Sequence, residues 1–170
     1  MPSPGTVNAL YEDKLGQIWV GSDSGLFRIH NNKIKKVSHG PKSAIEQIVS
    51  VSAASNDMWL STMNGVWHWQ SQTNNFKQLS CVEEKSFNQI IKYPNLGLMA
   101  LAGSGVYLFP ENKPCQKITY PGLPPDLRVE RIAQFKDKLL LAVRGRGLFQ
   151  CSKDCANVEF FCAKINKQTC

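Results

Sequence analysis

The residues best suited to bind a ligand are two arginines separated by one glycine, Arg144 and Arg146. Each guanidinium is a planar fork of N–H donors that pairs with carboxylate or sulfate oxygens through two parallel hydrogen bonds. Arg128 precedes them in the same basic part of the chain. The sequence leaves two interpretations open for the pair, an anion-binding site and the solvated tip of a hairpin.

Residues for catalysis are harder to find. Glu83 and Glu84 are adjacent carboxylates of the kind that serve as general acid and base, but neighbours in a loop are more often both solvated. The chain has no Gly-x-Ser-x-Gly, His-Glu-x-x-His or phosphate-loop motif. The two glycines in residues 103–107 lie between apolar segments, which is typical of a hairpin turn. We therefore expect no catalytic residue and no cofactor.

Six cysteines are compatible with disulfides in an oxidising compartment. Cys151 and Cys155 flank a short turn and are the best candidates for a local pair, although the sequence cannot choose among the possible pairings. No Cys-x-x-Cys pair is present, and the three histidines lie far from the cysteine cluster, so we expect no metal site. The cysteines are Cys81, Cys115, Cys151, Cys155, Cys162 and Cys170.

The net charge of +7 is unevenly distributed, with nine basic against four acidic residues from Arg128 onward. This basic quarter favours an anionic partner or is simply a solvated surface. Basic residues are not interleaved with aromatic ones, so we expect a small-molecule or anionic glycan ligand and no nucleic acid. The apolar stretches are too short to span a membrane and no signal peptide is visible, so membrane attachment is expected only through a parent chain.

Four glycines recur along the chain, each followed by an aliphatic and then an aromatic residue. Steps of 40, 40 and 42 residues between them, built from short apolar segments, are typical of β-propeller blades. We therefore predict an all-β fold, a single β-propeller domain over residues 1–170 with four blades of four antiparallel strands. The blades are expected at about 6–39, 45–80, 86–120 and 128–162. The glycines are Gly25, Gly65, Gly105 and Gly147.

Large apolar residues keep a constant distance from each glycine and are expected to fill the space between blades. Six residues before it stand Trp19, Trp59, Met99 and Leu141, followed by Val20, Leu60, Ala100 and Ala142. The turns between the second and third strands should gather with the inter-blade connections at one mouth of the ring. The predicted ligand-binding residues there are Asp23, Ser24, Asn64, Ser104, Arg128, Arg144 and Arg146.

The segment VNALYEDKLGQIWVGSDSGLFRI resembles the two-component regulator propeller repeat. Ser22 stands where that family usually has threonine, and the second unit keeps only Trp59, Ser61, Thr62 and Gly65. The last two units keep only their glycine and the apolar pattern. The resemblance is therefore specific in the first blade alone, where the matching residues are Asp13, Gly16, Ile18, Trp19, Gly21, Gly25 and Leu26.

The resemblance implies a periplasmic or otherwise extracytoplasmic, non-catalytic, ligand-sensing segment of a bacterial signal-transduction protein. The alternatives are a generic protein-interaction propeller and a propeller enzyme acting on glycans. Rings in that family usually have about seven blades, so four units form either a small closed ring or part of a larger one. An open half-ring would expose two apolar faces, to be covered by remaining blades or a second subunit.

Overall fold

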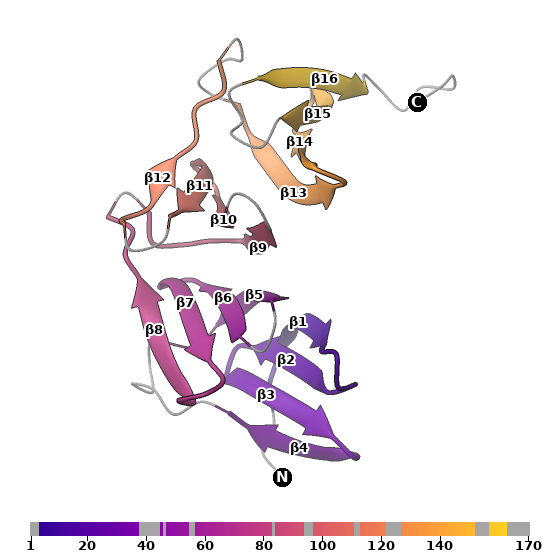
Figure 1. Cartoon of the computed structure of the whole chain (residues 1–170), viewed down its shortest axis with the longest axis vertical. Coiled ribbons are helices and arrows are strands. Elements are labelled where there is room, and N and C mark those ends of the chain that lie inside the picture. The colour runs from indigo at the N-terminus through magenta and orange to yellow at the C-terminus, as the bar shows by residue number, and fades with distance from the viewer. Residues whose placement is uncertain are drawn as a thin grey trace.

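The computed structural model describes residues 4–37, 45, 47–54, 57–82, 84–93, 97–110, 113–121, 127–151 and 157–162. These residues form sixteen strands in four separate antiparallel sheets, each of four strands in sequence order. In this part of the chain there is no helix, and hence none long and apolar enough to cross a membrane. The predicted all-β class and four-blade organisation are confirmed (Figure 1).

The strands are short and follow the predicted order within each blade. Blade 1 has β1 (Val7–Glu12), β2 (Ile18–Ser22), β3 (Gly25–His30) and β4 (Lys33–Lys36). Blade 2 has β5 (Ile48–Ala54), β6 (Asp57–Thr62), β7 (Gly65–Gln70) and β8 (Asn75–Leu79). Blade 3 has β9 (Gln89–Tyr93), β10 (Gly97–Ala102), β11 (Gly105–Phe109) and β12 (Gln116–Lys117). Blade 4 has β13 (Val129–Phe135), β14 (Lys138–Val143), β15 (Gly147–Cys151) and β16 (Val158–Cys162).

The repeated glycine begins the third strand of every blade and has a positive φ in all four, between 95° and 141°. Such angles are costly for residues with a Cβ atom, so glycine is favoured there. The hydroxyls of Ser22 and Thr62 donate to the carbonyls of Gly25 and Gly65 at 2.9 and 3.0 Å. Ser22 therefore makes the same hydroxyl-to-carbonyl bond in its turn as Thr62 does.

The four blades form an open arc (Figure 1). Strands β1, β5, β9 and β13 lie next to one another along its inner side, and β4, β8, β12 and β16 lie outermost. Figure 1 places blade 1 and blade 4 at opposite ends, and among the described residues no comparable packing joins β13 to β1. The four blades therefore do not close into a ring of their own.

Three hydrophobic cores hold the blades together, one at each junction. Trp19 and Leu26 of blade 1 pack with Leu60 and Trp67 of blade 2. Burial of such side chains stabilises a fold by about 25 cal/mol per Å² of apolar area. The second core contains Val66, Phe87, Ala100 and Tyr107, and the third contains Met99, Leu101, Leu141 and Phe149.

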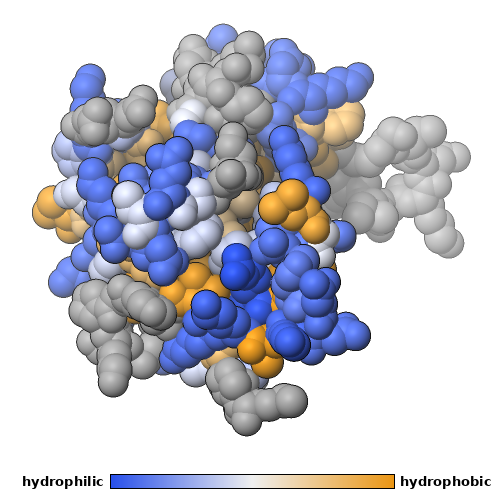
Figure 2. Space-filling view, turned by 60° about the horizontal axis from the view of Figure 1, so that its bottom comes forward, coloured by the Kyte–Doolittle hydropathy of each residue, from blue (hydrophilic) through white to orange (hydrophobic). Residues whose placement is uncertain are grey.

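The molecular surface differs from these cores. The face turned forward in Figure 2 is mostly hydrophilic with separate hydrophobic patches.

The predicted register is wrong by one residue in blade 4. Val20 pairs with Phe27 in blade 1, and the residue that pairs with the corresponding Phe149 is Leu141. Leu141 is therefore the counterpart of Val20 and faces the preceding blade, whereas Leu140 is the counterpart of Trp19. The cause is the turn between β14 and β15, which has three residues between its strands where the other blades have two.

Polar side chains bridge neighbouring inner strands. The Asn8 amide donates to the Ile48 carbonyl at 3.1 Å, and the Ser50 hydroxyl accepts from the Ile90 N–H at 3.2 Å. The Gln89 side chain donates to the Ile132 carbonyl at 2.7 Å and accepts from the Ile132 N–H at 2.9 Å. Each junction thus adds directional bonds to its apolar core, which fixes the relative height of adjacent blades.

A disulfide joins Cys81, just after β8, to Cys115, just before β12. A backbone hydrogen bond from the Cys115 N–H to the Ser80 carbonyl, 2.9 Å long, lies beside it. The bridge therefore clamps blades 2 and 3 at their outer side. Cys151 is also disulfide-bonded. The predicted pair of Cys151 with Cys155 involves a residue outside the described ones, so it stays a prediction.

Candidate functional site

Two of the three arginines singled out by the sequence, Arg128 and Arg144, meet at one carboxylate in blade 4. The Nε atoms of Arg128 and Arg144 lie 3.2 and 3.8 Å from Oε1 of Glu130. The Arg144 N–H also donates to the Arg128 carbonyl at 2.9 Å, so the connection before β13 and the turn after β14 are held together. Both arginine side chains remain more than 60% exposed and can reach a ligand.

Positive charge is in excess around Glu130. Arg146 lies in the same turn as Arg144, and Arg131 donates through Nη1 to the Glu130 carbonyl at 2.8 Å. Two guanidinium groups thus contact a single carboxylate, which leaves positive charge and N–H donors for an added anion. We call Arg128, Glu130, Arg144 and Arg146 the arginine cluster.

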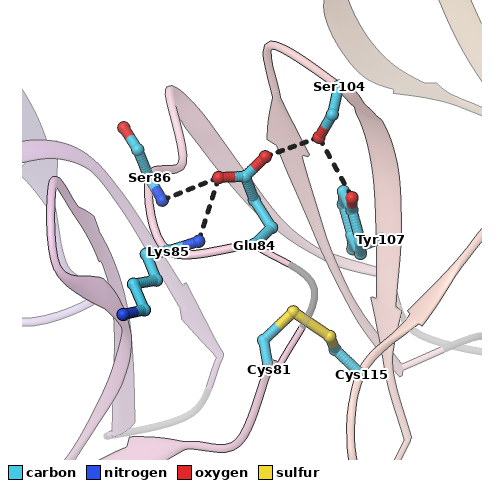
Figure 3. Close-up of a disulfide and its surroundings, with 7 residues drawn as sticks. All are labelled: Cys81, Glu84, Lys85, Ser86, Ser104, Tyr107 and Cys115. Atoms are coloured by element: carbon cyan, nitrogen blue, oxygen red, sulfur yellow. Dashed lines mark hydrogen bonds between the residues drawn. A yellow bond between two sulfur atoms is a disulfide. The ribbon is translucent and has the colours of Figure 1, made fainter.

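A second polar region lies between blades 2 and 3 and contains two more of the predicted residues. A cavity of about 520 Å³ is lined by Asn64, Gln78, Glu84 and Lys85, among others. Glu84 points toward the Ser104 hydroxyl, which donates to Oε2 (Figure 3). Asn64 therefore lines the same cavity as Glu84, and Ser104 contacts the Glu84 carboxylate, with the Cys81–Cys115 disulfide close by (Figure 3).

The Glu84 carboxylate is held in its charged form. Burial raises its pKa. Hydrogen bonds from the Ser104 hydroxyl and from the backbone N–H groups of Ser86 and Lys85, together with the charge of the Lys117 ammonium, lower the pKa and outweigh the effect of burial. The net pKa lies below the usual value of a glutamate. Glu84 is therefore an acceptor for ligand hydroxyls and a poor general acid at neutral pH.

The lowered pKa predicts a pH dependence of stability. A depressed carboxyl pKa contributes stability that is present above the unfolded value of about 4.3 and is lost as pH falls through the folded value. Glu84→Gln should remove that part of the acid dependence, measured by urea denaturation at a series of pH values. Glu159→Gln, a matched change on β16, is the control. Equal acid dependence in the unsubstituted chain and Glu84→Gln would contradict the prediction.

Asp23 and Ser24 lie in the turn between β2 and β3 as expected, but their side chains are hydrogen-bonded to residues at the start of the chain. The Asp23 carboxylate accepts from the Asn8 amide at 2.9 Å, and hydrogen bonds from the side chains of Asn8 and Thr6 lower its pKa. The Ser24 hydroxyl donates to the Pro4 carbonyl at 2.7 Å. The structure thus divides the seven predicted residues into three groups, one at each of blade 1, the junction of blades 2 and 3, and blade 4.

Two of the family-specific residues of blade 1, Asp13 and Trp19, line a different depression, between blades 1 and 2. This depression of about 170 Å³ includes Asp13, Trp19 and Arg28. Burial raises the pKa of Asp13, but hydrogen bonds from the Trp19 indole and the Gln17 and Leu15 N–H groups outweigh it and lower the pKa. Arg28 lies over the Trp19 ring at 5.6 Å. These contacts shape the turn between β1 and β2, so the repeat signature has a structural role.

Two residues of these sites were missed in the sequence. Glu130 was assigned only to a strand, although its place between Arg128 and Arg131 was a usable signal. Glu84 was expected to be solvated, and only the fold brings Ser104 to it. Its neighbour Glu83 lies outside the described residues. No group of three or more metal-ligating side chains occurs where the structure is described.

Comparison with known proteins supports the fold and the first repeat. Residues 2–24 match the family model described as two component regulator propeller. No curated protein matches the sequence. The extracellular domain of the hybrid two component system BT3049 from B. thetaiotaomicron is 16% identical with a TM-score of 0.69. The match covers 94% of this chain and 25% of that one.

A second domain of this kind, from the hybrid two component system BT4673 of the same organism, gives 15% identity and a TM-score of 0.62 over 95% of this chain and 28% of that one. Virginiamycin B lyase from Staphylococcus aureus gives 15% identity and a TM-score of 0.72, covering 95% and 57%. The chain thus spans about a quarter of the length of those extracellular domains and just over half of the lyase. The fold is that of a β-propeller, and the resemblance of the first blade to the two-component regulator propeller repeat is confirmed.

Proposed function

We propose that the chain is a non-catalytic, ligand-sensing propeller segment of an extracytoplasmic bacterial signalling protein, and that it binds an anionic glycan or a small anionic molecule at the arginine cluster. The convergence of Arg128 and Arg144 on Glu130 is the observation that carries the ligand class. Arg146, exposed in the same turn as Arg144, adds a further positive charge, and guanidinium groups are suited to a carboxylate or sulfate.

The signalling role is supported by the match of residues 2–24 to the two component regulator propeller model. An extracytoplasmic location is supported by the Cys81–Cys115 disulfide, because such bonds persist mainly in oxidising compartments. The similarity to sensor domains and to a lyase is a similarity of fold, so the choice of a sensor rests on the repeat motif and on the site.

The test is calorimetric titration with oligogalacturonate, a carboxylated oligosaccharide, and with its neutral methyl ester. We expect binding of the carboxylated form alone, weakened by added salt. A hydrogen bond to a charged group contributes about 1.5–3 kcal/mol, so the paired change Arg144→Gln and Arg146→Gln should weaken binding by roughly ten- to a hundred-fold or more. The matched control is Lys33→Gln with Lys35→Gln on β4, where exposed cations are also removed.

Equal binding of the neutral and carboxylated forms, or binding unaffected by loss of both arginines, would contradict the ligand assignment. Cleavage of the oligosaccharide during the titration would contradict the non-catalytic part and favour the propeller-enzyme alternative. Binding that the β4 variant loses as strongly as the arginine variant would show a diffuse charge effect without a site.

A further inference from the structure

The inner strand of blade 1 exposes two apolar residues, Val7 and Leu10, whose counterparts in the later blades are buried or, for Val51 of blade 2, partly buried. Val7 pairs with Ser22, as Ile48 pairs with Thr62 and Val129 with Val143. Ile48 and Val129 are buried at the blade junctions, whereas Val7 is 45% exposed.

Leu10 shows the same difference more strongly. It pairs with Val20, as Ile90 pairs with Ala100 and Ile132 with Leu141. Ile90 and Ile132 are 4% and 1% exposed, whereas Leu10 is 68% exposed. The inner part of blade 1 therefore has the apolar surface of a junction without the blade that would cover it.

Blade 4 has the complementary face at the other end of the arc. Leu148 occupies the position of Leu26, Val66 and Val106, which are buried against the next blade, but Leu148 is only half-buried. Phe135 is 44% exposed and its ring contacts that of Phe161, 43% exposed, at 6.1 Å between centroids. A face of this composition is typical of a buried contact.

The inner-strand bridges point to the same missing contact. Ser50 and Gln89 occupy equivalent positions in β5 and β9, and each bonds to the backbone of the next inner strand. The equivalent residue in β13 is Arg131, which is exposed. In this register, the Arg131 side chain would bond to the backbone of the following inner strand at the position that Ile90 has in β9 and Ile132 has in β13. In blade 1 this position is Leu10.

We propose that two copies of the chain pack head to tail, blade 4 of each against the inner strand of blade 1 of the other, and close an eight-bladed ring. One molecule carries both unsatisfied ends, so a two-fold pair covers both at once. Eight blades lie within the range of known propellers. Val20 and Phe27 are already buried within the chain, so the contact is centred on the inner strands, with Arg131 donating to the carbonyl of the partner's Leu10.

The test is the mass of the chain in solution, measured by sedimentation equilibrium over a range of concentrations. The unsubstituted chain should have twice the monomer mass. Leu10→Glu and Phe135→Glu should each give a monomer, because each places a charge in one of the two ends. Both positions are exposed in the single chain, so neither change should disturb its folding. Val82→Glu, at a site 86% exposed and outside both ends, is the matched control and should stay dimeric.

A monomeric unsubstituted chain would overturn the proposal and leave further blades of a longer polypeptide as the occupant of both ends. Loss of the dimer with Phe135→Glu but not with Leu10→Glu would also overturn it, because the blade 4 faces would then pair with each other. Growth into oligomers larger than a dimer would show head-to-tail packing without closure and would equally exclude the eight-bladed ring. The proposal does not depend on the ligand assigned above.

Discussion

Replacing Phe87 with alanine should lower the free energy of unfolding by about 3–5 kcal/mol, the usual cost of removing a fully buried phenylalanine ring. Phe87 is 0% exposed and lies in the core between blades 2 and 3. Its ring meets those of Tyr107 and Phe109 edge-on, at 5.7 and 5.6 Å between centroids. Both partners lie on β11, which is paired with β10 on one side and β12 on the other, so we expect little collapse around the cavity.

The measurement is urea denaturation followed by tryptophan fluorescence at one fixed protein concentration. Phe160→Ala is the matched control, since the same ring is removed from a side chain that is 48% exposed. It should cost clearly less than Phe87→Ala. Equal losses for the two variants, or a loss below about 1 kcal/mol for Phe87→Ala, would contradict the assignment of Phe87 to a packed junction.

Removing the disulfide by Cys81→Ala with Cys115→Ala should cost about 4 kcal/mol. The two cysteines are 34 residues apart, and closing a loop of this length in the unfolded chain accounts for that value in the chain-entropy account. The loop encloses β9, β10 and β11, so the bond restricts nearly all of blade 3. Substitution is preferable to a reducing agent, because Cys151 is also disulfide-bonded.

Unfolding of the double variant and of the parent chain should be compared without reductant, with circular dichroism to establish that the sheets are retained. The single change Ser80→Ala, next to Cys81, is the control for local disturbance and should leave stability nearly unchanged. A double variant as stable as its parent would show that the bond does not stabilise the clamp between blades 2 and 3.

The blades could be predicted from sequence because one local requirement recurs. A hairpin needs a residue of positive φ, and Gly25 and its three counterparts mark that place in each unit. The register of blade 4 could not be predicted in the same way. Counting from Gly147 assumes turns of equal length, and the three-residue turn from Arg144 to Arg146 shifts Leu141 by one position.

The candidate sites were only partly predictable. The turn residues were placed in the correct turns, because alternating apolar strands define where turns lie. Their partners could not be predicted, since Glu84 meets Ser104 across a junction of two blades and Cys81 meets Cys115 although β9, β10 and β11 lie between them in the sequence. Such contacts depend on how sheets stack, and periodicity carries no information on that.

The strand order inside each blade has a consequence for how the protein acquires its shape. Every sheet is completed by consecutive hairpins, and no described strand is exchanged between sheets. Strands that pair within a sheet are therefore neighbours in the sequence, so each sheet can form without distant parts of the chain. Each unit can assemble as it leaves the ribosome and serve as the template for its successor, so synthesis itself would build the arc from blade 1 toward blade 4.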